Sequence, residues 1–528
     1  MRKEWDTVVV GAGVGGLTAA ATLVRAGLRV LVLDRNPHPG GTAYVYHRKG
    51  FSFPMGPLGF SHPELVRSIF KNLGADDPLN LYRVHYRVKA FNLDVPLSLT
   101  SSQMVKDLST LFPSDAQGVE RFFQDIDRSL SSHTLPDSGI NRSRSAAEYL
   151  NGLIKDWRLH RILGSLGTQE PYSNLPLLAA QWNLMTKEGI WYPEAGMGPL
   201  CERLVRAVKE HPGDDQPYDV QRKAGKGDRG FGEIKLGMEV TKIRVSKDKV
   251  LGVTLRDGTQ IDSASVISNC DYKTTFLALL DPKEVPPKWR RAVSQSRQTG
   301  SVLQVCLGVD ANKADLSSFR EAARLIYRRN HKDLQAREEV DWSVAEVDPE
   351  TLCRQELEVS LWSKDDKTLA PEGKDVIVIR AAADYSHFAR YKLGWRKRSP
   401  AYLEYKHRLG RAFLREAEHL IPGLENSVLV MDVATPLTFE DQGGRSGGAV
   451  AGWSWDYQNF RDSSPRELVR TPIRGLYMAG YQAYSALFMG GIPTAMESGK
   501  RAAEAVLTNA DPTEEILIPG ADLLSPLA

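Results

Sequence analysis

The chain has 528 residues, with 68 lysines and arginines against 65 aspartates and glutamates, and a formal net charge of +3 at pH 7. Its length exceeds what one hydrophobic core usually supports, so two or three domains are expected. The near balance of charge gives no indication of nucleic acid binding, and no nucleic-acid partner is expected.

The cysteines and the apolar segments indicate the compartment. The four cysteines are far apart in the sequence and form neither a C-x-x-C pair nor a cluster with histidines, so they predict reduced thiols and no metal site. The start of the chain lacks the pattern of a signal or transit segment, and no window approaches about 18 consecutive apolar residues. These features predict a cytoplasmic protein, and they are compatible with peripheral membrane association.

Residues 7–16 predict a strand followed by a glycine turn. Thr7–Val10 is a short β-branched run suited to a strand buried on both faces, and the glycines after it have the spacing G-x-G-x-x-G. Gly11 allows the tight turn, Gly13 lets the backbone approach a pyrophosphate, and Gly16 lets a helix pack closely on the strand. With Val14 and Gly15, these residues predict the phosphate-binding loop of a dinucleotide site.

Residues 17–34 complete the unit. An Ala- and Leu-rich helix follows the glycines, Gly27 ends it, and Arg29–Leu33 predicts a second strand. Asp34 lies at the tip of that strand, within reach of ribose hydroxyls. An acidic residue there disfavours the 2′-phosphate of NADP, so FAD and NAD remain.

The following loops favour FAD. Gly40 and Gly41 form a second glycine pair, and residues 50–57 read GFSFPMGP. This stretch resembles the FAD-dependent amine oxidase and phytoene desaturase superfamily, in which the glycine pair wraps the pyrophosphate and an aromatic-x-Asp-x-Gly-Pro loop meets the flavin. Pro54 stands where those proteins have the aspartate, so its hydrogen bond is not carried over. The resemblance implies cofactor contacts from Arg35, Gly41, Thr42, Met55, Gly56 and Pro57.

The C-terminal end resembles the same superfamily. Residues 475–480 match its last strand, and residues 490–499 match the glycine loop that enters its last helix. The positive end of this helix would face the pyrimidine side of the flavin, and small residues would let the helix pack beside the first one. Tyr481 replaces the usual acidic residue after the strand. The resemblance implies cofactor contacts from Gly480, Tyr481, Gly491 and Ile492.

Two further features support FAD. Residues 237–269 predict a β-meander, which the superfamily carries inside its dinucleotide fold, with the backbone at Val240 holding the adenine; Asp257-Gly258 is a hairpin signal within it. No cysteine follows Cys353, so the thioether that some amine oxidases form near their C-terminus is excluded. FAD is expected to be bound noncovalently.

These motifs predict an α/β fold, with a Rossmann-like FAD-binding domain containing an inserted β-meander and a mixed α+β substrate domain. The expected parts are FAD-binding segments over 1–95, 195–300 and 426–510, a helical cap over 96–194, a substrate domain over 301–425 and a tail over 511–528.

Within the insertions, apolar spacing predicts several elements. Ser101 or Ser102 is expected to cap the first helix. The elements are helices over Met104–Leu111, Val119–Leu130, Ala146–Leu163 and Pro199–Val208, strands over Ser301–Val309 and Val376–Arg380, and a long helix with Tyr402, Tyr405, Leu409, Phe413 and Leu420 on one side.

A second G-x-G-x-x-G, Gly225–Gly230, lacks a buried strand before it and a helix pattern after it. It predicts a basic loop rather than a nucleotide site. Without a second dinucleotide fold there is no dedicated NADPH site, so oxygen, a quinone or another small carrier is the expected electron partner.

Residues 434–453 resemble a flavin-side segment of phytoene desaturases, carotenoid isomerases and retinol saturase-like enzymes. The resemblance implies an FAD-dependent oxidoreductase that acts on carbon–carbon bonds of a hydrophobic isoprenoid or polyene by hydride transfer to or from flavin N5. No catalytic base is assigned; Trp453, Tyr481 and Tyr484 are the candidates near the flavin. The alternatives are a soluble flavin oxidase of amines or amino acids, and a flavin-stabilised regulatory or scaffold protein.

Overall fold

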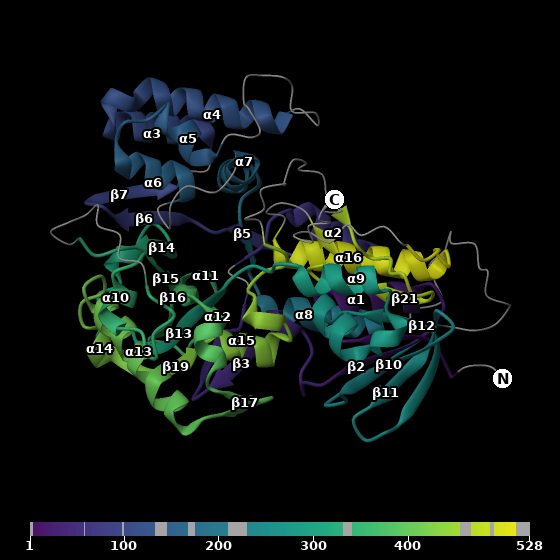
Figure 1. The fold of residues 1–528 in the computed structure, drawn as a ribbon. Coiled ribbons are helices and arrows are strands. Elements are labelled where there is room, and N and C mark those ends of the chain that lie inside the picture. Colours follow the sequence, from purple (N-terminus) through teal and green to yellow (C-terminus); the bar gives the residue numbers. More distant parts are fainter. Residues whose placement is uncertain are drawn as a thin grey trace, which may run out of the picture.

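The computed structural model describes residues 4–56, 59–75, 77–97, 100–131, 145–166, 175–209, 230–330, 340–454, 466–485 and 490–513. The described residues form two units, each built on a seven-stranded sheet, and a helical bundle that covers one edge of the second (Figure 1). Gly225–Arg229 of the second glycine motif and Pro57 lie outside the described residues.

The first sheet has the order β10-β11-β12-β1-β2-β9, and β21 pairs with β12. β1 pairs in parallel with both β2 and β12, whereas β10, β11 and β12 form the antiparallel meander. The predicted Rossmann-like fold with an inserted meander is confirmed. The strands are β1 (Trp5–Val10), β2 (Arg29–Asp34), β9 (Phe231–Leu236), β10 (Val240–Ser246), β11 (Lys249–Leu255), β12 (Gln260–Ser268) and β21 (Leu476–Met478).

Helices α1 (Val14–Arg25) and α16 (Gly491–Leu507) lie side by side against this sheet (Figure 1). A Cβ built on Gly499 would stand 2.2 Å from the carbonyl oxygen of Gly15, so the two backbones approach more closely than any side chain would allow. The predicted face of small residues is therefore where the first and last helices meet. α2 (Pro63–Asn72), α8 (Met197–Lys209) and α9 (Pro287–Gln295) complete the unit.

The second sheet has the order β19-β13-β16-β15-β14-β6-β7. On one face, Leu303, Val305 and Ile379 pack against α13 (Pro400–Glu418), the predicted long helix, in one apolar core. The other face turns toward the first unit. The strands are β6 (Tyr86–Ala90), β7 (Leu93–Leu97), β13 (Ser301–Asp310), β14 (Arg324–Tyr327), β15 (Leu357–Leu361), β16 (Lys374–Ala383) and β19 (Val428–Ala434).

This sheet takes strands from segments that the sequence assigned to the FAD-binding domain. β6 falls at the end of the 1–95 segment, β7 crosses the boundary of that segment, and β19 falls at the start of the 426–510 segment, yet all three pair within the second sheet. Their partners are distant in sequence, so no local pattern marks the crossing. The second sheet is thus built from three parts of the chain.

The bundle α3–α7 lies above β6 and β7 (Figure 1). The single helix expected over Ala146–Leu163 is instead two. The Asp115 carboxylate accepts hydrogen bonds from the Lys155 and Asp156 backbone N–H groups, and Asp156 caps the second helix; these side chains replace the helical hydrogen bonds at the break. The helices are α3 (Ser101–Leu111), α4 (Ala116–Ser131), α5 (Ala146–Asn151), α6 (Trp157–Ser165) and α7 (Leu175–Asn183).

The N-cap of α3 is Thr100 rather than Ser101 or Ser102, since the Thr100 hydroxyl accepts a hydrogen bond from the Gln103 backbone N–H at 3.2 Å. We expect Thr100→Ala to destabilise α3 by about 1 kcal/mol, whereas Ser101→Ala leaves it nearly unchanged. Amide hydrogen exchange in α3 measures both effects. Equal protection loss in the two variants would contradict the assignment of the cap.

Shorter elements connect the two sheets and the bundle. They are β3 (Val45–Arg48), β4 (Phe51–Pro54), β5 (Leu81–Arg83), β8 (Trp191–Pro193), α10 (Pro349–Cys353), α11 (Trp362–Asp365), α12 (Tyr385–Ala389), β17 (Lys392–Gly394), β18 (Lys397–Arg398), α14 (Leu424–Ser427), α15 (Pro436–Gly443), β20 (Arg466–Glu467) and β22 (Tyr484–Ser485).

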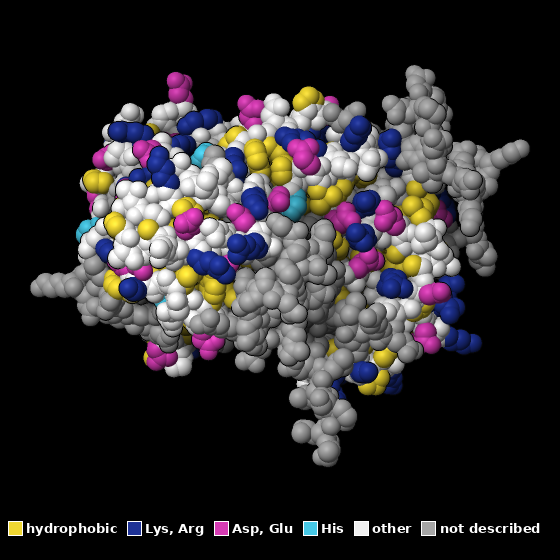
Figure 2. Space-filling model, turned by 90° about the horizontal axis from the view of Figure 1, so that it is seen from above, with side chains coloured by type: hydrophobic (Ala, Val, Ile, Leu, Met, Phe, Trp, Pro, Cys, Tyr) yellow, Lys and Arg dark blue, Asp and Glu magenta, His cyan; other side chains and the backbone are white. Residues whose placement is uncertain are grey.

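The surface reflects the balanced charge. Basic and acidic side chains are interspersed over the face seen in Figure 2, with small apolar patches between them. None of the helices in the described part of the chain is both long and apolar enough to cross a bilayer.

Candidate functional site

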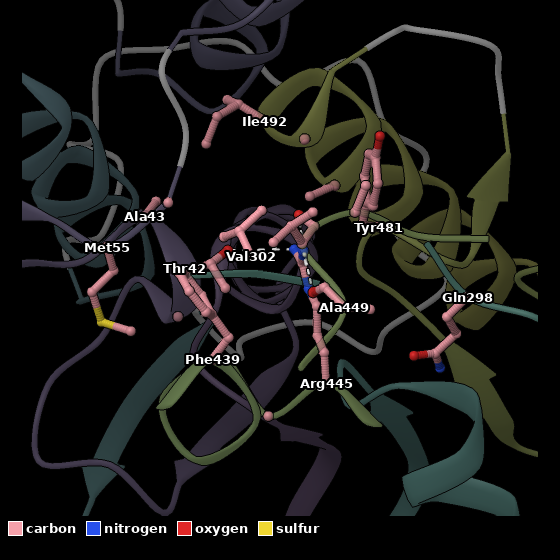
Figure 3. A pocket seen from close by; sticks show the side chains of 18 of the residues that line it. Thr42, Ala43, Met55, Gln298, Val302, Phe439, Arg445, Ala449, Tyr481 and Ile492 are labelled. Atoms are coloured by element: carbon pink, nitrogen blue, oxygen red, sulfur yellow. Dashed lines mark hydrogen bonds between the residues drawn. The ribbon is translucent and has the colours of Figure 1, made fainter. Parts of the chain in front are cut away.

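A cavity of about 650 Å³ lies between the two sheets (Figure 3). One end is lined by the glycine loops and helix N-termini of the first unit, and the other by strands and loops of the second. This volume is in the range of a cofactor or ligand pocket. The predicted residues that line it are Gly13, Val14, Gly15, Gly41, Thr42, Met55, Gly56, Gly480, Tyr481, Gly491 and Ile492.

The first glycine loop is built for close backbone approach. Gly11 has φ +104°, and a Cβ on Gly16 would stand 2.1 Å from the Gly11 carbonyl oxygen, so these two glycines shape the turn and the helix–strand contact. Gly13 and Gly15 face the cavity at the N-terminus of α1. Bare backbone N–H groups at the positive end of a helix dipole suit a phosphate.

A second helix N-terminus points at the same cavity. Gly490 caps α16, and Gly491 and Ile492 of its first turn line the wall. In Figure 3, Ile492 lies at the top of the view and Tyr481 at the right, with Met55 and Thr42 across from Tyr481 on the left. Two positive helix ends meeting in one cavity favour a ligand that carries negative charge along its length.

Asp34 lies outside the lining and holds the loop in shape. Its carboxylate accepts hydrogen bonds from the backbone N–H groups of Ala12, at 2.7 Å, and Asn36, at 2.8 Å. Burial raises the pKa of this carboxyl despite those hydrogen bonds. The Met238 backbone N–H donates to the Asp34 carbonyl, which brings the start of β10, with Val240, beside the strand tip. The expected adenosine contacts are thus near one another.

Arg35, also expected to contact the cofactor, lies at this end of the site. It donates a hydrogen bond to the Asp441 carbonyl at 3.1 Å, and its guanidinium lies 5.6 Å from the Trp395 ring centroid. It therefore joins the first unit to the β17–β18 hairpin of the second.

Asn269 is a site residue that the sequence did not single out. It follows β12, and its side chain lies over the glycine loop: its Nδ2 is 2.7 Å from a Cβ built on Gly13, and its Oδ1 is 2.7 Å from one built on Gly15. The Oδ1 atom is buried and accepts no hydrogen bond from any described residue. An unpartnered acceptor in this place fits a ligand hydroxyl. The sequence feature that could have identified it is an asparagine directly after β12, a strand that pairs in parallel with β1.

Replacing Asn269 by leucine, which has the same shape but no acceptor, is expected to weaken FAD binding by up to about tenfold, the value of one hydrogen bond. Titration of the apoprotein with FAD measures the effect. Unchanged affinity would show that the Oδ1 atom makes no contact with the cofactor.

Arg445 was likewise not anticipated. It reaches the cavity from the loop after α15, donates hydrogen bonds to the Val450 carbonyl at 2.7 Å and the Thr42 hydroxyl at 3.4 Å, and its guanidinium lies 5.6 Å from the Tyr481 ring centroid. Burial lowers its pKa, but an arginine remains charged at neutral pH. It adds a fixed positive charge beside the glycine loops (Figure 3).

The second sheet forms the far wall. Val302 of β13, Arg380 and Ala382 of β16, Glu358 of β15 and Ile326 of β14 line it from neighbouring strands. Arg328, Arg354 and Glu356 line the same end, and Arg328 forms an ion pair with Glu356 at 3.4 Å. Apolar and charged side chains thus share the wall.

The residues present fit FAD. Two glycine loops without side chains, two helix N-termini and an unpartnered acceptor suit a long ligand with phosphates and hydroxyls, and the cavity continues beyond them to the second sheet. The family model for flavin containing amine oxidoreductases matches residues 14–368, more than half of the chain. The chain belongs to this family.

Individual members of the flavin amine oxidoreductase superfamily align with nearly the whole chain. The prolycopene isomerase of Daucus carota chloroplasts is 25% identical and covers 90% of this chain and 76% of its own length. The lycopene-forming phytoene desaturase of Pantoea ananas is 24% identical, covering 95% and 99%. A solved oxidoreductase from Methanosarcina mazei shares the fold, with a TM-score of 0.60 at 17% identity over 94% of this chain and 99% of that one.

This flavin amine oxidoreductase is therefore an FAD-dependent enzyme, as predicted. Of the three candidates for a catalytic role, Tyr481 lines the cavity. Trp453 instead packs in the core of the first unit, edge-on to Tyr272, with its indole N–H donating to the Gln482 carbonyl at 2.9 Å. The ring centroid of Tyr484 lies 4.9 Å from the Arg501 guanidinium, and Tyr484 is also outside the cavity lining.

Proposed function

We propose that this flavoenzyme oxidises, reduces or isomerises carbon–carbon bonds of a hydrophobic isoprenoid or polyene. Two observations together support the proposal. Relatives named prolycopene isomerase and phytoene desaturase align over at least 90% of the chain. One continuous cavity extends from the glycine loops to the second sheet. An elongated substrate entering along the second sheet would meet the flavin where the two units face each other.

The chain's own residues would bind the substrate, orient it toward the flavin and exclude water from the cavity. When bound, FAD supplies acceptance or donation of a hydride. Val302, Ile326 and Phe439 give the wall apolar surface against which a hydrocarbon can be aligned. Asp271, a carboxylate in the lining, already accepts hydrogen bonds from the Ser446 and Thr274 backbone N–H groups. It therefore acts as a loop anchor rather than a base.

The main alternative is an oxidase of amines or amino acids, in keeping with the name of the family. Among the described residues that line the cavity there is neither a lysine nor a histidine. That composition gives no candidate for a lysine that holds a reactive water, and it favours chemistry in which positioning dominates.

The test is anaerobic flavin bleaching in the purified holoprotein. A polyene substrate, or a reduced carrier followed by a polyene, is expected to change the flavin absorbance and yield a product with altered unsaturation or geometry. Bleaching by small amines or amino acids, with no response to polyenes, would overturn the proposal in favour of the oxidase. A polypeptide that binds no added FAD would overturn both.

We further propose that oxygen or a quinone is the electron partner and that the enzyme reaches its substrate by peripheral contact with a membrane. Leu393 and Trp395 on the β17–β18 hairpin are 67% and 41% exposed, which suits contact with lipid. Co-sedimentation with vesicles and reoxidation by soluble quinones measure these two properties separately.

A further inference from the structure

The far wall of the cavity carries more charge than a hydrocarbon requires. Gln304, Arg380 and Glu358 stand in register on the adjacent strands β13, β16 and β15, and the last two line the cavity. Bringing a neutral polyene against this row would remove water from charged groups without replacing it.

Arg380 is the central residue of this row. Its Nε donates to the Gln304 side-chain oxygen at 2.6 Å, and its Nη2 donates to the Gly56 carbonyl at 3.0 Å. Its guanidinium lies 5.4 Å from the Trp362 ring centroid. These partners are neutral, and they fix the plane of the guanidinium beside the loop that is proposed to hold the flavin.

No carboxylate of the described residues forms an ion pair with Arg380, and none of their atoms accepts a hydrogen bond from its Nη1. Glu358 is its register neighbour but lies beyond ion-pair distance and accepts a hydrogen bond from Ser360. A buried arginine that has no carboxylate partner among the residues that the structure describes is a site at which a ligand anion gains most.

The other arginines at this end of the cavity have carboxylate partners. Arg328 forms an ion pair with Glu356, as does Arg161 from outside the lining. Arg354 forms an ion pair with Glu350. Arg380 therefore presents the N–H edge that is open to a ligand, and the planar guanidinium matches the geometry of a carboxylate. The charged residues that line this end are Arg328, Arg354, Arg380, Glu356 and Glu358.

We propose that Arg380 binds a carboxylate on the substrate, so that the enzyme acts on a polyene or isoprenoid acid rather than on a bare hydrocarbon. This inference rests on the proposed function for the polyene part, whereas the carboxylate part stands on the geometry of Arg380 alone. Arg380 is assigned as a substrate-binding and specificity residue, held in place by Gln304 and Gly56.

The experiment titrates the FAD-loaded protein with all-trans-retinoic acid and with its methyl ester, following the flavin difference spectrum. We expect the acid to bind at least about tenfold more tightly than the ester. Arg380→Gln should bring the ratio close to one, and Arg380→Lys should keep part of the preference, since it keeps the charge but loses the planar fork. Arg320→Gln, an exposed arginine of the same unit, is the matched control and should behave as wild type.

Benzoate and L-phenylalanine separate the two proposals. If benzoate binds and Arg380→Gln weakens its binding, while neither retinoid binds, the carboxylate site stands and the polyene assignment is overturned. If L-phenylalanine bleaches the flavin and Arg380→Gln abolishes the bleaching, the carboxylate site also stands, and the substrate is an amino acid rather than a polyene acid. Equal affinity for acid and ester in wild type, or an unchanged ratio in Arg380→Gln, overturns the inference.

One competing role of Arg380 has its own readout. If the guanidinium served only to stabilise negative charge on the reduced flavin, Arg380→Gln would lower the flavin reduction potential and leave the acid-to-ester ratio unchanged. Potentiometry on the same variants therefore accompanies the titrations, and this pair of results would overturn the inference.

Discussion

Gly13→Val should give a folded protein that purifies without flavin colour. The glycine caps α1 with φ −74°, a conformation open to any residue, so the variant has no backbone strain. Its new Cβ would stand 2.7 Å from the Asn269 amide nitrogen, and the two further methyl carbons would fill the space over the loop. Because a pyrophosphate must approach that backbone, we expect the affinity for FAD to fall by at least about 100-fold.

The measurement is flavin content per polypeptide, followed by titration of the apoprotein with FAD. Gly198→Val is the matched control, because Gly198 lies in α8 and a Cβ there would have nothing within 4 Å. It should bind FAD as wild type does. A Gly13→Val protein with full flavin content would place the phosphates elsewhere.

Arg324→Met is expected to have the largest effect on stability. Arg324 is 1% exposed, at the start of β14, and its Nη1 lies 2.9 Å from Asp365, which is 11% exposed. The methionine would fill much of the space but leave the carboxylate buried without its cation. Loss of one partner of a buried pair costs about 3–5 kcal/mol, which a shift in the denaturant midpoint would report.

The loss should depend on pH with a defined sign. Burial raises the pKa of Asp365 above the ordinary value of an aspartate side chain, and the charge of Arg324 opposes that rise. Without the arginine, the pKa in the folded state would rise further. A carboxyl with a raised folded pKa favours folding below its unfolded pKa, and that contribution is lost as the pH rises through the folded pKa. The variant should therefore be least destabilised at acidic pH.

Arg206→Met is the control for this prediction. Its partner Asp77 lies 3.3 Å away, and the two side chains are 51% and 64% exposed. Solvent screens such a pair, so the expected cost is about 0–1 kcal/mol with little change between pH 5 and 8. Equal losses in the two variants would show that the buried pair has no special role.

The features predicted most accurately from the sequence are local. Gly11, Gly13 and Gly16 define their turn by spacing, and the face of Gly499 toward the first helix follows from helical periodicity. Gly11 is required by its φ of +104°. Gly16 and Gly499 are required by close contacts, since a Cβ would stand 2.1 Å from the Gly11 carbonyl oxygen and 2.2 Å from the Gly15 carbonyl oxygen, respectively. Motifs of this kind encode their own geometry.

Features that depend on pairing between distant segments could not be predicted from the sequence. β6, β7 and β19 lie in segments assigned to one domain but pair in the sheet of the other, because strand partners are chosen by long-range register. Arg380 was placed in a predicted strand, but which face it occupies depends on its pairing with Gln304 and Glu358. Charged residues within strands next to a cavity were the signal that could have identified it.

The contact between α1 and α16 has a consequence for biosynthesis. The helix that begins at Val14 emerges from the ribosome nearly 500 residues before its partner at Gly499. Until then its apolar side is uncovered and the cofactor pocket lacks a wall, so flavin capture is postponed to the end of translation. Chaperone demand and flavin supply should both limit the yield of active enzyme in a cell.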